Sequence, residues 1–226
     1  MLQFTKQTST DAIALNPSQP AVGSVIWLHG LGADGNDFLS IAPELHLPDS
    51  LPLRFIFPHA PMQPVTINNG YVMRAWFDIY SPQLDQRIDE KGIQASIKRL
   101  EQYIEQEEQA GIPSDKIILA GFSQGSVIAL CTGLCFPKKL AGVIALSGLL
   151  PHPERVISVA SPTNQTLPLF IGHGTMDTIV PFAFGEAMQT ALKQHGYPVT
   201  WHHYPMPHSV CTDEINDIAT WIKNIF

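Results

Sequence analysis

Short apolar segments alternate with helical segments along this chain, and this alternation constrains the fold more than any other feature. Six runs, most of them rich in Val, Ile, Leu and Phe, predict strands at residues 24–28, 53–57, 116–120, 140–146, 167–171 and 199–204. Helical spacing of apolar residues predicts helices at residues 37–45, 88–110, 124–135, 182–194 and 212–226. Because the strands lack apolar–polar alternation, both faces of their sheet must be covered. We therefore expect an α/β fold with a mostly parallel central sheet and helices on both faces.

Composition and charge exclude several classes of protein. Apolar residues make up 45% of the chain and charged residues 15%, which excludes intrinsic disorder and a coiled coil. The net charge is −7, and no basic run is longer than the pair Lys138-Lys139, so we expect no nucleic-acid partner. The longest apolar runs, such as residues 117–122, are too short to span a membrane. Without a repeat or a long linker, residues 1–226 are predicted to form a single domain.

The cysteines and the first residues indicate a compartment. Three cysteines in 226 residues do not form a disulfide framework, and the first 15 residues lack the apolar core of a signal peptide. We therefore expect a cytoplasmic protein. Cys131 and Cys135 lie four residues apart on one predicted helix, without His or acidic neighbours at ligand spacing, so they are interpreted as packing residues. We expect neither a metal nor a cofactor.

The residues that follow each strand are the most informative, because sites in parallel α/β sheets lie at the carboxyl ends of the strands. The strand at 116–120 runs directly into Gly-Phe-Ser-Gln-Gly at residues 121–125 and then into a helix. This is the G-x-S-x-G pattern and setting of a nucleophile elbow, in which a sharp turn exposes a reactive serine. Ser123 is therefore the predicted nucleophile. The alternative is a serine that only caps the helix.

A serine nucleophile requires a histidine base and a carboxylate that orients it, and on this fold they follow in the order acid, then histidine. Asp177 lies in the loop after the strand at 167–171, and His208 lies in the loop after the last strand. The other carboxylates between Ser123 and His208 are Glu154, in a proline-rich connection, and Glu186, in a helix. We therefore predict the triad Ser123, Asp177 and His208.

The first predicted strand ends in His-Gly-Leu-Gly at residues 29–32. One interpretation is a dinucleotide-binding glycine motif, but that motif needs an acidic residue after the next strand, which ends in Phe-Pro-His. The other interpretation is a loop that supplies an oxyanion donor. The two donors are then the backbone N–H groups of Leu31 and Gln124, and His29 is a structural hydrogen bonder.

Residues 60–76 form an unusually long connection, which is typical of a lid-like loop near a site. Its apolar residues are numerous enough to form one wall of a groove beside Ser123. Met73 and Trp76 are the predicted substrate-binding residues, with an ordinary core position as the alternative for Trp76.

Six segments together resemble the acyl-protein thioesterase and bacterial carboxylesterase group of α/β-hydrolases: WLHGLGADGNDF (27–38), FPHAPMQPVTINNGYVMRAWFDI (57–79), AGFSQGSVIAL (120–130), ALSG (145–148), GHGTMDTIVP (172–181) and YPMPHSVC (204–211). The resemblance implies an α/β-hydrolase that cleaves carboxylic esters and acyl thioesters without a cofactor. It assigns the same triad and the same oxyanion donors. Residues 65–76 are more similar to the bacterial carboxylesterases. Ser126 departs from the family, which usually has glycine there.

We therefore predict a serine hydrolase of short to medium acyl esters, acting through an acyl-enzyme on a small-molecule ester or thioester. The alternative is an acyl-protein thioesterase or lysophospholipase that uses the same triad on acylated proteins or lipids. A non-catalytic binding protein of the same fold is the less favoured alternative, because the triad is intact. A monomer or a homodimer is expected.

Overall fold

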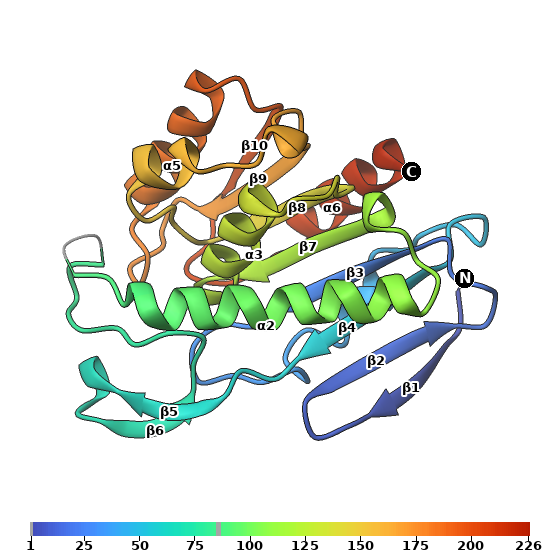
Figure 1. Cartoon of the computed structure of the whole chain (residues 1–226), viewed down its shortest axis with the longest axis horizontal. Coiled ribbons are helices and arrows are strands. Elements are labelled where there is room, and N and C mark those ends of the chain that lie inside the picture. Colours follow the sequence, from blue (N-terminus) through green and yellow to red (C-terminus); the bar gives the residue numbers. More distant parts are fainter. Residues whose placement is uncertain (1, 85–86) are drawn as a thin grey trace.

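The computed structural model describes residues 2–84 and 87–226, and in this part of the chain the centre is an eight-stranded sheet (Figure 1). Its order is β1-β2-β4-β3-β7-β8-β9-β10. Neighbours from β4 to β10 pair in parallel, whereas β1–β2 and β2–β4 are antiparallel, so the predicted mostly parallel sheet is confirmed. The strands are β1 (Phe4–Thr8), β2 (Ala12–Pro17), β3 (Gly23–Leu28), β4 (Leu53–Pro58), β7 (Ile117–Phe122), β8 (Gly142–Leu146), β9 (Leu169–Gly174) and β10 (Val199–Tyr204).

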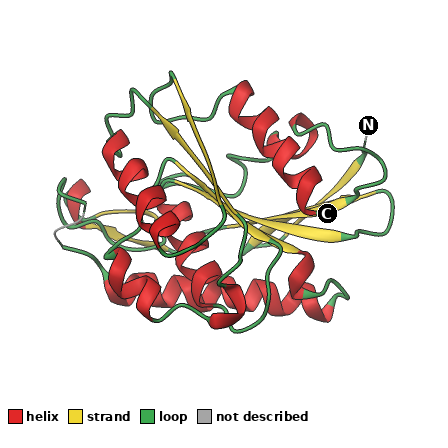
Figure 2. Ribbon diagram, turned by 90° about the horizontal axis from the view of Figure 1, so that it is seen from above, coloured by secondary structure: helices red, strands yellow, loops and turns green. Residues whose placement is uncertain are grey.

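Helices cover both faces of the sheet, as Figure 2 shows from above. One core contains residues of α2, α3 and α5, and the other contains residues of α1 and α6. The helices are α1 (Ile41–Glu44), α2 (Glu90–Gln109), α3 (Gln124–Cys135), α4 (Pro153–Ser158), α5 (Phe182–Gln194) and α6 (Thr212–Ile225), with short 3₁₀ turns η1 (Thr66–Asn68), η2 (Ser114–Lys116) and η3 (Pro162–Asn164).

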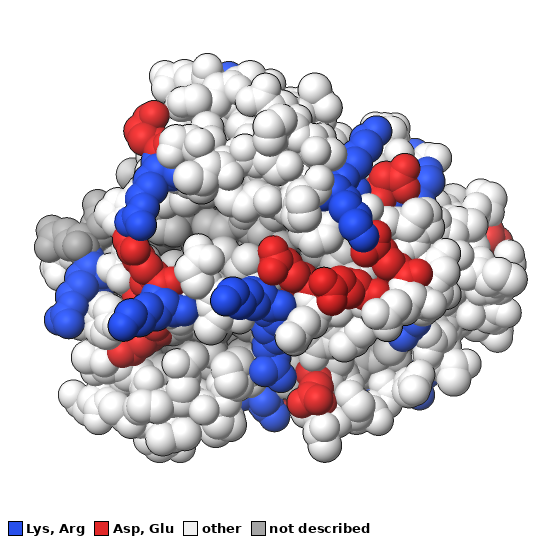
Figure 3. Space-filling view, in the orientation of Figure 1, with Lys and Arg blue, Asp and Glu red and all other residues white. Residues whose placement is uncertain are grey.

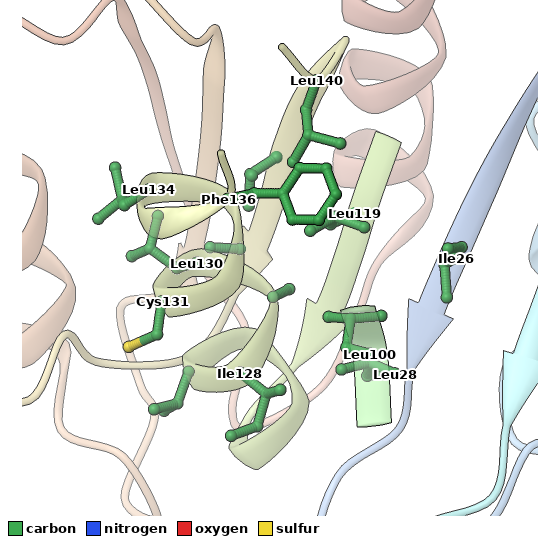
Figure 4. Packing of buried hydrophobic residues seen from close by; sticks show 14 of the residues in the cluster. Ile26, Leu28, Leu100, Leu119, Ile128, Leu130, Cys131, Leu134, Phe136 and Leu140 are labelled. Atoms are coloured by element: carbon green, nitrogen blue, oxygen red, sulfur yellow. The ribbon is translucent and has the colours of Figure 1, made fainter. Parts of the chain in front are cut away.

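Successive residues of the central strands serve the two cores in turn. In β7, Leu119 faces the α2–α3 core, whereas Ile118 and Ala120 face the other core. Helix α3 is buried along nearly its whole length, and its apolar side chains lie in one core with Leu100 of α2 and Leu119 of β7 (Figure 4). This burial on both faces explains why the central strands β3, β7 and β8 are apolar almost throughout.

Helix α2 is amphipathic, as the sequence predicts. The carboxylate of Asp89 caps it by accepting a hydrogen bond from the N–H of Gly92 at 3.0 Å. Its predicted apolar stripe is buried, whereas acidic and basic side chains lie beside one another over its outer face (Figure 3). The stripe is Ile93, Ile97, Leu100 and Ile104.

Some elements differ from the predictions. Residues 60–76 are not an irregular loop: they contain a β-hairpin of β5 (Met62–Val65) and β6 (Tyr71–Arg74), with its turn at Asn69 and Gly70, both of positive φ. Helix α1 is shorter than predicted, since residues 35–40 form turns. The hairpin of β1 and β2 and the short helix α4 were not predicted. Within residues 2–84 and 87–226, no helix is long and apolar enough to cross a membrane.

Four loops at the carboxyl ends of the parallel strands hold the predicted site residues. They follow β3, β7, β9 and β10, which with β8 are five adjacent strands of the sheet. The loops carry Leu31, Ser123, Asp177 and His208 respectively.

Candidate active site

Ser123 lies at the sharp turn between β7 and α3. Its backbone has φ 56° and ψ −118°, a conformation that L residues rarely adopt. The flanking glycines are required by close backbone approach: a Cβ on Gly121 would lie 2.2 Å from the carbonyl oxygen of Gly125, and one on Gly125 would lie 2.4 Å from that of Leu28. The Ser123 side chain does not cap α3. The geometry is therefore that of a nucleophile elbow and disfavours the helix-cap interpretation.

Asp177 and His208 form a short hydrogen bond. Nδ1 of His208 lies 2.6 Å from Oδ2 of Asp177. The other carboxylate oxygen of Asp177 accepts hydrogen bonds from the N–H groups of Ile179 and Val180, each at 2.9 Å. The Asp177 side chain is fully buried, whereas that of His208 is 15% exposed. The carboxylate therefore holds Nδ1, and Nε2 is the ring nitrogen that this contact leaves open.

The ring of His208 packs beside the nucleophile turn. Its centroid lies 4.6 Å from that of Phe122, the residue immediately before Ser123. A Cβ on Gly174, at the end of β9, would lie 2.5 Å from the carbonyl oxygen of Pro207, so the loops that carry Asp177 and His208 also touch. The fold therefore brings the three predicted triad residues to one place. A direct hydrogen bond between Ser123 and His208 stays a prediction.

His173 is a supporting residue that the sequence analysis did not assign. It is fully buried at the end of β9, and its Nε2 donates a hydrogen bond to the carbonyl of Val180 at 2.8 Å. Burial lowers the pKa of His173, which favours the neutral ring. Because the N–H of Val180 binds Asp177, His173 stabilises the loop that orients the carboxylate.

The predicted oxyanion loop lies against Ser123. A Cβ on Gly30 would lie 3.5 Å from Cβ of Ser123. Leu31, Ser123 and Gln124 line the same cavity. Within the described ranges, the backbone N–H groups of Leu31 and Gln124 donate no hydrogen bond to the protein. Both donors are therefore available to a ligand oxygen.

His29 supports this loop as a neutral ring. Its Nδ1 lies 2.7 Å from the carbonyl oxygen of Gly30, and its Nε2 accepts a hydrogen bond from the N–H of Ala60 at 3.1 Å. This pattern places the proton on Nδ1. Burial is the main reason that the pKa of His29 falls to about 4.

Trp76 is a core residue, so its prediction as a substrate-binding residue is corrected. It is only 2% exposed, and its indole N–H donates to the carbonyl of His29 at 2.9 Å. The side chain of Gln124 accepts from the N–H of Trp76 at 2.8 Å and donates to the carbonyl of Phe77 at 2.6 Å. Gln124 thus joins the nucleophile turn to residues 76 and 77.

A cavity of about 450 Å³ opens beside Ser123, with a mostly apolar lining. Met73 is not part of the lining, and neither is Trp76. Met73 instead lies on the hairpin, where its sulfur accepts a hydrogen bond from Asn68 at 3.4 Å. The larger apolar lining side chains are Leu31, Ile67, Phe77, Ile79, Leu84, Ile88, Ile93, Leu149 and Ile179. This lining suits an apolar chain attached to a reactive carbonyl.

The cysteines and the other potential metal ligands do not form a second site in the part of the chain that the structure describes. Cys131 is buried, and burial raises the pKa of its thiol to about 12, which agrees with the predicted packing role. Among residues 2–84 and 87–226, no three His, Cys, Asp or Glu side chains lie together as a metal site would require.

Comparison with known proteins identifies the family. The phospholipase/carboxylesterase family model matches residues 10–226, nearly the whole chain. The chain belongs to this family. Family membership establishes that the protein is a hydrolase with the α/β-hydrolase fold, as the resemblance of its motifs implied.

Individual proteins of known name are similar to this chain over nearly its full length. Acyl-protein thioesterase 1 of Yarrowia lipolytica is 36% identical over 217 residues, covering 94% of this chain and 96% of that protein. The crystal structure of Arabidopsis thaliana SOBER1 is 33% identical with a TM-score of 0.84, covering 90% of this chain and 98% of that one. Zea mays acyl-protein thioesterase 2 is 28% identical with a TM-score of 0.83, covering 95% and 98%.

Proposed function

We propose that this protein is a serine hydrolase of acyl thioesters and esters, with acyl groups on proteins as its preferred substrates. The observation that carries the proposal is the 2.6 Å bond between Asp177 and His208 beside the strained Ser123 turn, at the mouth of an apolar cavity. Relatives named acyl-protein thioesterases support this alternative over the short- to medium-chain carboxylesterase that the sequence analysis favoured.

In the proposed mechanism, the hydroxyl of Ser123 attacks the acyl carbonyl while Nε2 of His208 accepts its proton. Asp177 stabilises the imidazolium and fixes its orientation. The N–H groups of Leu31 and Gln124 stabilise the oxyanion, and loss of one such donor typically costs about 10²–10³-fold in rate. The thiol or alcohol leaves with the proton from His208. Water then attacks the acyl-enzyme by the same route and releases the acid.

The cavity supplies the proposed acyl site. Each methylene that leaves water gains about 0.8 kcal/mol until the cavity is full. We propose that the β5–β6 hairpin forms one lip of this site, because Ile67 at its turn is part of the lining. The lid-like role of residues 60–76, the single domain over residues 1–226, the cytoplasmic location and the monomeric or dimeric state stay predictions.

Competing hydrolysis assays test the substrate class. We expect kcat/KM for an S-acyl cysteine peptide to exceed that for an O-acyl serine peptide of the same sequence and chain length, and for a lysophospholipid. The Ser123→Ala variant should hydrolyse none of them above background. A preference for the O-ester or the lysophospholipid would contradict the thioesterase assignment, whereas failure to react with a fluorophosphonate probe would favour the non-catalytic alternative.

A further inference from the structure

Ser126, in the first turn of α3, binds the backbone of the predicted nucleophile. Its hydroxyl donates a hydrogen bond to the carbonyl oxygen of Ser123 at 2.8 Å, and its own N–H lies 3.1 Å from the same oxygen. Ser126 is 1% exposed, so water does not compete for this bond.

The carbonyl of Ser123 and the N–H of Gln124 belong to the same peptide unit. A trans peptide is planar, so its C=O and N–H point in opposite directions. A donor that holds the Ser123 oxygen therefore also fixes the direction of the Gln124 N–H. It polarises the peptide as well, which makes that N–H a stronger donor to an oxyanion.

The first oxyanion peptide is held in the same way. Nδ1 of His29 donates to the carbonyl oxygen of Gly30 at 2.7 Å, and the N–H of the same peptide belongs to Leu31. Each of the two proposed oxyanion donors thus has a buried side chain bound to the opposite end of its peptide unit.

The hydroxyl of Ser126 also lies directly against Gly148. A Cβ on Gly148 would lie 1.6 Å from it, so the hydroxyl fills the space that Gly148 leaves open. The strained φ and ψ of Ser123 need such support, because conformations of this kind persist only where the surroundings hold them.

We propose that Ser126 is a positioning residue for the oxyanion hole: its hydroxyl fixes the Ser123–Gln124 peptide so that the Gln124 N–H points at the developing oxyanion. This inference rests on the proposed function.

The test removes the hydroxyl with Ser126→Ala and with Ser126→Gly. We expect kcat to fall about fivefold or more in both variants, the size of one ordinary hydrogen bond, with KM changed less than twofold. Affinity for an alkyl boronic acid, which forms a tetrahedral adduct on the nucleophile, should fall by the same factor as kcat/KM. Ser158→Ala is the matched control, because the Ser158 hydroxyl donates to the carbonyl three residues earlier at the same 2.8 Å but lies on α4.

A spectroscopic measurement separates positioning from simple packing. The infrared carbonyl band of the acyl-enzyme, trapped at low pH, should move to higher wavenumber in both Ser126 variants because the donors bind it less well. Unchanged kcat, boronate affinity and carbonyl band, even with a lowered melting temperature, would overturn the inference. If Ser123→Ala still hydrolysed substrate, the proposed function itself would fail. If Ser123→Ala were inactive but both Ser126 variants were as active as the wild type, only the role of Ser126 would be rejected.

Discussion

At the scale of single residues, hydrogen bonds fix the orientation of the Asp177 carboxylate and the tautomer of His208. Asp177 uses one oxygen for two backbone N–H groups and the other for His208. The carboxylate cannot rotate without losing these bonds, so the imidazole is held in the tautomer with its proton on Nδ1.

The Asp177→Asn variant tests this arrangement. The amide oxygen should keep the bonds from Ile179 and Val180, which turns the NH₂ group toward His208 and forces the wrong tautomer. We expect kcat to fall about 10⁴-fold with little change in stability. Glu186→Gln is the control, since Glu186 is an exposed carboxylate on α5. A loss of less than tenfold in Asp177→Asn, measured by steady-state hydrolysis, would contradict the triad.

The sequence suggested the candidate catalytic residues but not the residues that hold them in place. Ser123, Asp177 and His208 follow strands in the chain order of the fold, so position alone suggested them. His173 and Ser126 act through the carbonyls of Val180 and Ser123, and no motif encodes such contacts. Trp76 was misplaced because an aromatic residue in a long connection has the same pattern whether it is buried or faces a cavity.

At the scale of elements, the β5–β6 hairpin determines which residues of 60–76 reach the cavity. Ile67 lies at the turn and is part of the lining, whereas Val72 lies on β6 and is 52% exposed. The hairpin was not predicted, because Pro64 lies within β5 and proline argues against a strand. Strand β1 was not predicted because it is an exposed edge strand of mostly polar residues, whereas strands were expected only at apolar runs.

The pair Ile67→Ala and Val72→Ala tests the role of the hairpin in acyl selection. In Ile67→Ala we expect kcat/KM for an octanoyl thioester to fall severalfold, with a smaller effect on the acetyl thioester, because only the longer chain contacts the missing methylenes. Val72→Ala should leave both rates unchanged. If Ile67→Ala lowered both rates equally, the hairpin would support the triad and not select the acyl group.

At the scale of the whole molecule, the order of the strands brings the loops after β3, β7, β9 and β10 together at the carboxyl ends of the parallel strands. The alternation of strands and helices predicted a parallel sheet, and hence a site at the carboxyl ends. The order of the strands was not predictable from the sequence, because it depends on which buried faces fit together. The pairing of β3 with β7 brings the predicted oxyanion loop beside Ser123.

Glu214 couples the stability of the molecule to pH. It is fully buried on α6, and neither carboxylate oxygen has a hydrogen-bond partner among the described residues. Burial, with a smaller effect of the charge on Asp217, raises the pKa of Glu214 to about 8. In the unfolded chain the pKa of a glutamate carboxyl is about 4.3. Between about pH 4.3 and pH 8 the folded protein therefore binds one more proton than the unfolded chain. The free energy of unfolding therefore falls as pH rises from about 4 to 8.

The Glu214→Gln variant removes this titration. We expect its melting temperature to exceed that of the wild type at pH 9, by several degrees, and the difference to shrink at pH 5, where the wild-type Glu214 is protonated and neutral in the folded protein. Glu105→Gln, on the outer face of α2, should show no such trend. Parallel melting curves for Glu214→Gln and the wild type across this range would contradict the buried neutral carboxyl.

The most direct test of the central claim is the mass of the enzyme during turnover. The wild-type protein is mixed with an acyl thioester, quenched in acid within milliseconds, digested and analysed by mass spectrometry. We predict one acyl group, on the peptide that contains Ser123, which is absent in Ser123→Ala and forms orders of magnitude more slowly in His208→Ala. Acyl transfer to a different residue, or hydrolysis by Ser123→Ala within tenfold of the wild-type rate, would contradict the assignment of Ser123 as the nucleophile.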